Sequence, residues 1–264
     1  MKPDLLITWH ESCDYPIARM FIKRYRDFFG RIIVYLSKHF REPIYAEFLK
    51  QSMKDLDILF LDPIEYKYGV EDWRNISTNY MLKHSNSEWV CSIEQDWFCQ
   101  DWPRLLEECK YRMKTSAGLF GWYSQTANSY VHPAFWFVRR ELLEKTGKDF
   151  LPHSEIKGSD HFAMITYKVK ELGELVVGLR VGEVNPKSLA FHLGGVNQNY
   201  LEGMKPEYVF HRPEIFYVYN YFCRKASVIQ SPLFADISLK IEEKLRAMFP
   251  DLNPETSPWG KFFI

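Results

Sequence analysis

In the N-terminal part of the chain, short apolar runs alternate with segments in which apolar positions recur at helical spacing. Four runs have the length and composition of buried strands and occupy residues 4–9, 31–36, 57–61 and 89–93. The segments between them carry helix signals, with Pro16 and Pro43 at starts, Asp72 as a cap and Gly30 as a stop. Strands separated by helices predict a parallel sheet with right-handed crossovers.

After residue 100 the pattern is mixed rather than strictly alternating. Strands are predicted at residues 117–122, 134–138, 175–181 and 188–191. Helices are predicted after Asp101 and over residues 140–146, where Gly147 ends the second. A further helix follows Ser159 and Asp160, which can cap it, and ends at Gly173. Its apolar positions, which we expect to face inward, are Phe162, Ile165, Val169 and Leu172.

The last segment, residues 205–264, is aromatic-rich and then amphipathic. The positions at helical spacing are Ile237, Ile241, Leu245 and Met248. We predict one α/β domain over residues 1–204, with a mainly parallel sheet flanked by helices, and a C-terminal helical extension packed on it. Its aromatic run 215–225 is a candidate for packing on that domain or for peripheral contact with a membrane surface.

Composition narrows the class of protein. The chain has 264 residues, of which 46% are hydrophobic, enough for a large core. Lys+Arg and Asp+Glu both number 34, so no whole-chain field attracts nucleic acid or anionic lipid. The five cysteines are odd in number and lack C-x-x-C spacing, which favours a reducing compartment. Without a signal-like start or a bilayer-length apolar stretch, we expect a soluble, cytoplasmic protein.

Two carboxylates, Glu94 and Asp96, directly follow the apolar run 89–93. Ligands of open α/β sheets bind in the crevice outside the carboxyl ends of the strands. Two acids at that place predict a metal or phosphate site. Acidic residues also cap strands and open turns, so the pair by itself leaves a purely structural role open.

Four segments, taken in order, resemble the GT-A class of glycosyltransferases, especially its large inverting family. They are DWRNISTNYMLKHSNSEWVCSIEQDWF at 72–98, FWFVRRELLEKTG at 135–147, GSDHFAMITYKVKELG at 158–173 and FHLGG at 191–195. The resemblance implies a GT-A fold with a nucleotide-sugar-binding half, residues 1–100, and an acceptor half, residues 101–204. It does not extend to residues 205–264.

The resemblance also implies a divalent cation, Mn²⁺ or Mg²⁺, bound at the E-x-D stretch. Asp96 matches the motif acid that reaches the metal directly, and His192 matches a metal-binding histidine. Glu94 stands where Asp is usual, so it binds the metal directly, binds it through water, or holds the donor ribose. A set of oxygen and nitrogen ligands suits Mn²⁺ at least as well as Mg²⁺. The remaining histidines considered are not spaced as a zinc set: His10, His132, His153, His161 and His211.

Asp160 lies where the family's catalytic base does. A carboxylate at a helix N-terminus is held ionised and ready to accept a proton from an acceptor hydroxyl. The alternative is a plain helix cap. A single carboxylate base facing a leaving diphosphate implies inversion at the anomeric carbon.

For the donor nucleotide, the resemblance implies contacts in the turn after the first strand, at Trp9, His10 and Glu11. Arg74 matches the Arg of an Arg-Asn pair that reaches base or phosphate. The acid that many members carry after the second strand is missing at residues 37–39, and Asp62 is the candidate substitute. UDP is the favoured nucleotide. Rings that either platform sugars or belong to the core are Trp97, Trp122, Phe135 and Trp136.

The leading hypothesis is a metal-dependent, inverting glycosyltransferase that moves a sugar from a nucleoside-diphosphate sugar to a hydroxyl acceptor, which is a glycan, a lipid-linked sugar or a small molecule. One alternative is an inactive nucleotide- or carbohydrate-binding module with the same fold, since Glu94 replaces Asp. The other is a sugar-phosphate nucleotidyltransferase, although no Gly-rich phosphate loop follows residues 4–9.

Overall fold

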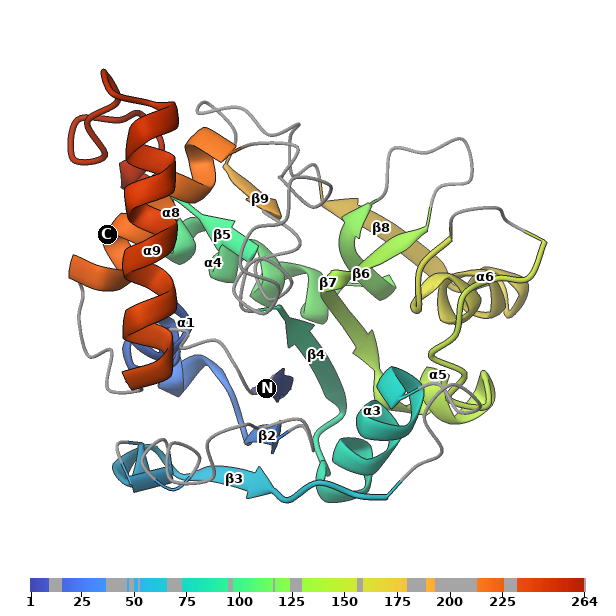
Figure 1. Ribbon diagram of the computed structural model, residues 1–264. Coiled ribbons are helices and arrows are strands. Elements are labelled where there is room, and N and C mark those ends of the chain that lie inside the picture. The colour runs from blue at the N-terminus through green and yellow to red at the C-terminus, as the bar shows by residue number, and fades with distance from the viewer. Residues whose placement is uncertain are drawn as a thin grey trace.

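A seven-stranded sheet runs through the centre of the molecule in the computed structural model (Figure 1). Its strand order is β3-β2-β1-β4-β7-β6-β8. The strands are β1 Asp4–Trp9, β2 Ile32–Leu36, β3 Ile58–Leu61, β4 Trp89–Ile93, β6 Ala117–Tyr123, β7 Val131–Arg139 and β8 Leu175–Leu179. The structure describes residues 1–9, 16–36, 47, 50–51, 53–65, 73–94, 97–115, 117–123, 130–155, 159–179, 189–192, 213–225 and 232–263.

Strand directions define the edge at which a ligand site is expected. Strands β1 to β4 pair in parallel, β7 is antiparallel to both β4 and β6, and β8 is parallel to β6. Every strand of this sheet except β7 therefore ends at one edge, the carboxyl edge, and β7 begins there. The predicted mixed, mainly parallel sheet is confirmed.

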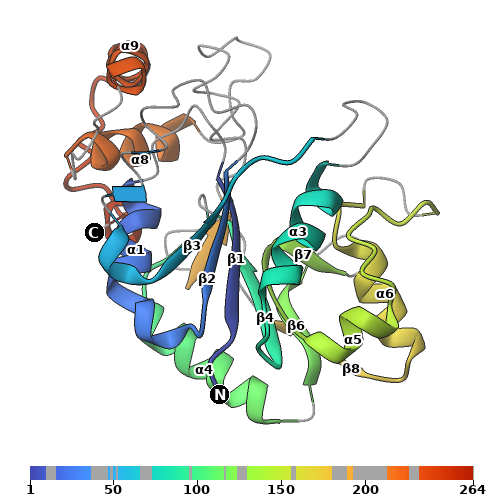
Figure 2. The ribbon, with the colours of Figure 1, turned by 90° about the horizontal axis from the view of Figure 1, so that it is seen from below.

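Helices cover both faces of the sheet (Figure 2). On one side lie α1 Pro16–Tyr25 and α4 Trp102–Lys114; on the other lie α3 Trp73–His84, α5 Arg140–Lys145 and α6 Ala163–Glu171. Side chains of a strand point alternately to the two faces, so β1 contributes Leu5 and Ile7 to one core cluster and Leu6 to the other. The sheet is thus buried on both sides, as a mainly parallel sheet requires.

Local signals fixed several helix ends. Asp101 caps α4, where its side chain accepts a hydrogen bond from the backbone N of Arg104 at 3.1 Å. Gly147 and Gly173 end α5 and α6 with φ of 77° and 76°, a conformation that glycine adopts without strain. The helix expected after Pro43 lies mostly outside the described residues.

One residue expected to face inward is exposed. Leu172 is 47% exposed, so this prediction is wrong. Met248, which stands at helical spacing in the last segment, is likewise 48% exposed. Leu172 follows the last residue of α6, and Met248 is the last residue of α9, Pro232–Met248. Each helix has passed the margin of the core at these positions, although the apolar period continues.

A second, two-stranded sheet joins β5 Trp97–Cys99 to β9 Ala190–His192. The strands are antiparallel, with Trp97 opposite His192 and Cys99 opposite Ala190. The sequence analysis predicted β9 but not β5, because three residues are too few for a periodic pattern.

The C-terminal helix α8 Pro213–Lys225 packs on α9 and on β5. Asn220 and Ser238 bond across the two helices inside the core, with Ser238 Oγ donating to Asn220 Oδ1 at 2.8 Å. Phe98 of β5 contacts Tyr219 and Phe263, with ring centroids 5.3 and 4.8 Å apart. Most aromatic side chains of α8 are therefore used in packing, and no helix among the described residues is long and apolar enough to cross a membrane.

Candidate active site

Four polar side chains from distant parts of the sequence gather at the carboxyl edge. Glu94 follows β4, and His132 lies at the start of β7, the strand that begins at this edge. Arg74 is in the first turn of α3, which leads into β4, and Asp160 precedes α6, which leads into β8. A helix that connects to a following parallel strand begins at the carboxyl edge, so topology brings these residues together.

Asp160 and Arg74 meet across 86 residues of sequence. Arg74 Nη1 lies 3.5 Å from Asp160 Oδ1, and the side chains are 41% and 33% exposed. Ion pairs this exposed contribute about 0–1 kcal/mol to stability. The pair therefore leaves both groups accessible to a ligand.

The backbone around Asp160 is held by neighbouring groups. Its N–H donates to Tyr130 Oη at 3.1 Å, and its Oδ1 accepts from the backbone N of His161 at 2.7 Å. The hydroxyl of Ser159 is bonded to the backbone of His153 instead of to the helix. The predicted side-chain cap of α6 is wrong, because Phe162 takes the cap position without a side-chain hydrogen bond.

Two histidines that the sequence analysis did not select lie beside the Asp160 carboxylate. His132 Nε2 is 3.8 Å from Oδ2, and His161 Nε2 is 3.8 Å from Oδ1. Asp160, Arg74, His132, His161 and Tyr130 are called the Asp160 cluster below. His161 adjoins Asp160 in the sequence, whereas His132 lies far before it, so no local pattern connects His132 to this carboxylate.

Glu94 is half-buried at the end of β4. Its backbone N donates to Ala134 O at 2.9 Å, and its carbonyl accepts from Trp97 N at 3.1 Å. The first bond extends the β4–β7 ladder by one residue, and the second joins Glu94 to the first residue of β5. Asp96 lies outside the described residues.

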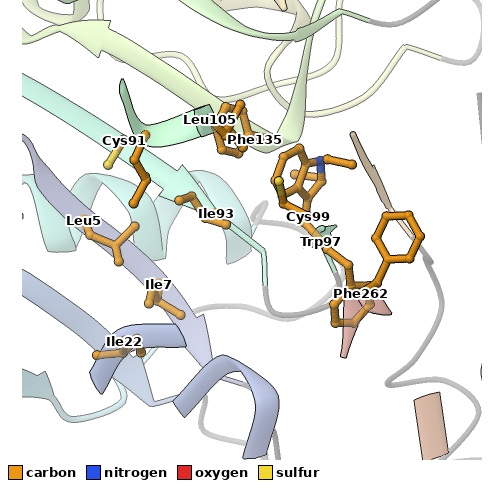
Figure 3. Packing of buried hydrophobic residues seen from close by; sticks show 14 of the residues in the cluster. Leu5, Ile7, Ile22, Cys91, Ile93, Trp97, Cys99, Leu105, Phe135 and Phe262 are labelled. Carbon is orange, nitrogen blue, oxygen red and sulfur yellow. The ribbon is translucent and has the colours of Figure 1, made fainter. Parts of the chain in front are cut away.

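A small apolar pocket with a cavity volume of about 30 Å³, partly open to solvent, lies beside Glu94 and is called the Trp97 pocket below. It is lined by Ile7, Trp9, Phe21, Ile22, Ile93, Glu94, Trp97, Phe98, Trp102 and Phe262. Figure 3 shows Ile7, Ile22, Ile93, Trp97 and Phe262 among the packed side chains. Among the described residues that line this pocket, Glu94 alone is ionisable.

His192 is placed by its backbone. It stands opposite Trp97 in the β5–β9 ladder, while its side chain lies outside the described residues. Directly opposed residues of antiparallel strands have Cα atoms about 4.5–5.5 Å apart. The ladder thus brings His192 beside the residue that follows Asp96. Among the described side chains, no group of three or more His, Cys, Asp or Glu is arranged to hold a metal ion.

The remaining candidates lie in different environments. Trp9 has an exposed fraction of 0% and lines the Trp97 pocket, while His10 and Glu11 lie outside the described residues. Asp62 follows the edge strand β3, is 80% exposed and pairs with Lys50 at 3.2 Å.

Three of the four aromatic candidates for sugar platforms belong to the core. Trp97, Phe135 and Trp136 are 2%, 0% and 3% exposed. Trp122 is half-buried, and its ring centroid lies 4.2 Å from that of His132. Trp122 alone among them borders the Asp160 cluster.

No protein-family model and no curated protein sequence matches the chain. Among solved structures, the chain is similar to the mannosyltransferase PcManGT from Pyrobaculum calidifontis in complex with GDP-Man and Mn²⁺, with a TM-score of 0.52, 12% identity, and 98% of this chain and 78% of that chain covered. For glucosyl-3-phosphoglycerate synthase from Mycobacterium tuberculosis the TM-score is 0.46 and the identity 10%, with 67% of each chain covered. For the bifunctional IspDF from Campylobacter jejuni the TM-score is 0.44 and the identity 13%, with 75% of this chain and 54% of that chain covered.

At such identities, likeness to a solved structure concerns the fold. The mannosyltransferase match extends over almost the whole chain, and the sheet has parallel strands in the order β3-β2-β1-β4 followed by one antiparallel strand. The chain therefore has a GT-A-like fold, as the sequence resemblance predicted.

Proposed function

We propose that the protein is a metal-dependent, inverting glycosyltransferase that transfers a sugar from a nucleoside-diphosphate sugar to a hydroxyl acceptor. The observation that carries the proposal is the meeting of Arg74 and Asp160, 3.5 Å apart, at the carboxyl edge of a GT-A-like sheet. A cation for the donor diphosphate and a carboxylate base for the acceptor are the two charges that this reaction requires.

Asp160 serves as the base in this proposal. Its carboxylate is one-third exposed, so an acceptor hydroxyl can reach it. The hydroxyl proton passes to the carboxylate as the acceptor oxygen bonds to the anomeric carbon. The bond from that carbon to the diphosphate oxygen breaks, and the nucleoside diphosphate leaves with the electron pair. Attack opposite the leaving group inverts the anomeric centre.

Arg74 is assigned to the donor phosphates. Its guanidinium forms a half-exposed ion pair, which contributes little to folding and can be exchanged for a phosphate at small cost. Trp9, His10, Glu11 and Asp62 remain the proposed contacts of the base and ribose.

Asp96, Glu94 and His192 are the proposed ligands of Mn²⁺ or Mg²⁺. Two carboxylates and an imidazole fit such a cation, and the ladder register that sets His192 opposite Trp97 supports the combination. A divalent cation there neutralises charge that grows on the leaving diphosphate. The mannosyltransferase neighbour binds GDP-Man and Mn²⁺, so GDP belongs in the first screen beside the expected UDP.

A thermal-shift screen of nucleoside diphosphates with and without Mn²⁺ tests the proposal first. A ligand at one hundred times its Kd raises stability by about 2.7 kcal/mol, because it binds only the native state. We expect a shift that needs both nucleotide and metal, and that Asp96→Ala abolishes. Asp251→Ala, which removes an exposed carboxylate from the C-terminal turn, is the matched control and keeps the shift.

Turnover separates the alternatives. Nucleoside diphosphate release from a UDP- or GDP-sugar supports a glycosyltransferase. Pyrophosphate release from a nucleoside triphosphate and a sugar phosphate supports a nucleotidyltransferase instead. Metal-dependent nucleotide binding without turnover on a broad acceptor panel supports a binding module.

A further inference from the structure

The imidazole of His132 is fixed in one orientation and one tautomer. Its Nδ1 accepts a hydrogen bond from the backbone N of Ala134 at 3.1 Å. A backbone N–H can only donate, so Nδ1 carries no proton, and the proton of the neutral ring is on Nε2. The indole of Trp122 packs on the ring, and the His132 side chain is only 18% exposed.

The protonated nitrogen faces the proposed base. His132 Nε2 and Asp160 Oδ2 are 3.8 Å apart, beyond the 2.7–3.2 Å of a direct N–H···O hydrogen bond. One oxygen atom placed about 2.8 Å from each reaches both without moving either. Tyr130 and the backbone of His161 hold Asp160, so the donor and the acceptor are both held in place.

We propose that His132 is a positioning residue for the acceptor, and this inference rests on the proposed function. The acceptor hydroxyl donates its proton to Asp160 Oδ2 while its oxygen accepts a hydrogen bond from His132 Nε2. As the new bond to the anomeric carbon forms, the hydroxyl proton moves to Asp160, and His132 keeps its own proton throughout.

The arrangement selects the chemical class of the acceptor. A hydroxyl oxygen has two lone pairs, so one accepts from Nε2 while the other attacks. An uncharged amine has a single lone pair, and the hydrogen bond from Nε2 would occupy the pair needed for attack. The Asp160 cluster therefore favours an oxygen nucleophile over a nitrogen one.

Two substitutions separate positioning from structure. Asn at position 132 places an amide oxygen near the position of Nδ1 and keeps the bond to Ala134, but it has no group at the position of Nε2. Gln places an amide nitrogen near Nε2 and loses the Ala134 bond. If His132 has only a structural role, His132→Asn should cost less activity than His132→Gln. If His132 positions the acceptor, His132→Gln should cost less activity than His132→Asn.

Kinetics on the donor that the wild type uses provide the first test, with nucleoside diphosphate release measured in water and with added glycerol as hydroxyl probes. We expect His132→Asn to lower kcat about 10- to 100-fold at nearly unchanged donor KM, since a misplacement of about 1 Å costs that much. His132→Gln should retain most of kcat. Equal kcat in both variants and wild type, or equal losses in both variants with a lowered Tm, would overturn the proposal.

His153 supplies a matched control. Its Nδ1 also accepts from the backbone N two residues on, Glu155, at 3.3 Å, and its ring packs on Tyr167. No contact of the His153 side chain with Asp160 occurs among those that the described residues show. His153→Asn and His153→Gln are expected to leave kcat unchanged.

The tautomer can be measured without any turnover. In ¹⁵N-labelled protein, imidazole NMR should show the His132 proton on Nε2, and the signal should vanish in His132→Asn. A proton on Nδ1 would overturn the inference even if the enzyme is a glycosyltransferase. If the wild type cleaves no nucleoside-diphosphate sugar, the proposed function fails and the acceptor role falls with it, whatever the tautomer.

Discussion

The Asp160 cluster and the Trp97 pocket lie at the same edge of the sheet but are built differently. In the cluster, polar side chains that are 18–41% exposed stand 3.5–3.8 Å from the Asp160 carboxylate. In the pocket, buried rings pack closely, as Trp97 stacks on Phe135 with centroids 4.3 Å apart and contacts Trp102 at 5.4 Å. Loosely paired charges can exchange partners with a ligand, whereas packed rings can only be removed at the expense of the fold.

This difference predicts which substitutions change activity and which change stability. Substitutions of Asp160 and Arg74 should change activity and leave stability almost unchanged, because exposed ion pairs contribute little to folding. Substitutions of the packed apolar side chains of the Trp97 pocket, Trp9 excepted, should do the reverse, because burial of aromatic surface is a main source of stability.

The largest effect is expected for Asp160→Asn. Removal of the proposed base should lower kcat by 10²- to 10⁴-fold, which corresponds to about 3–5 kcal/mol in the activation barrier. Tm should change little. Nucleoside diphosphate release and differential scanning fluorimetry measure the two effects. Asp149→Asn, which removes a half-exposed partner of Lys168, is the control, and undiminished turnover by Asp160→Asn would exclude it as the base.

Trp97→Ala should have the opposite effect to Asp160→Asn, with a large loss of stability. The side chain is 2% exposed, and replacement of a buried Trp or Phe by Ala costs about 3–5 kcal/mol of unfolding free energy. Urea denaturation measures the loss. Tyr111→Ala removes a ring that is 59% exposed and should change stability by about 0.5 kcal/mol or less. Equal effects of the two substitutions would show that the pocket does not stabilise the fold.

Arg74→Gln should weaken nucleotide binding by a smaller amount. A hydrogen bond to a charged group contributes about 1.5–3 kcal/mol, or roughly 10- to 150-fold in Kd. Titration calorimetry with the nucleoside diphosphate that gives the largest thermal shift, in Mn²⁺, measures it. Arg104→Gln, on the exposed face of α4, is the matched control. If the Kd of Arg74→Gln equals that of the wild type, Arg74 does not bind the phosphates.

The smallest expected effect is a pH dependence of stability, which comes from a buried thiol on the side of the sheet that holds the Trp97 pocket. Burial raises the pKa of the Cys99 thiol from 9.0 to about 12. The unfolded chain loses this proton first, so stability is fully present below pH 9 and falls as pH rises from 9 to about 12. At pH 10 the loss is about 1.4 kcal/mol for this group. Urea midpoints of wild type and Cys99→Ala at pH 8 and pH 10 measure it, and parallel changes in both would contradict the prediction.

Local sequence patterns were sufficient for the elements that depend on neighbouring residues. The runs at residues 4–9 and 89–93 became β1 and β4 with the expected bounds. Asp101 caps α4 and two glycines end α5 and α6 because a cap or a left-handed stop involves residues only a few positions apart. The GT-A resemblance of ordered segments likewise needed only their order along the chain.

The candidate site divides in the same way. The apolar run 89–93 drew attention to Glu94 and Asp96 directly after it, and the GT-A resemblance added Arg74, Asp160 and His192. Alternating strand and helix periods over residues 1–100 also predicted a mainly parallel sheet.

Only the tertiary structure decided which of these residues meet. It brought Arg74 to Asp160, set His192 opposite Trp97, and placed His132 beside the proposed base. These contacts join positions that no periodic pattern relates, because strand order and register are set by packing over the whole sheet. The sequence by itself determined the chemical groups, and the fold determined their partners.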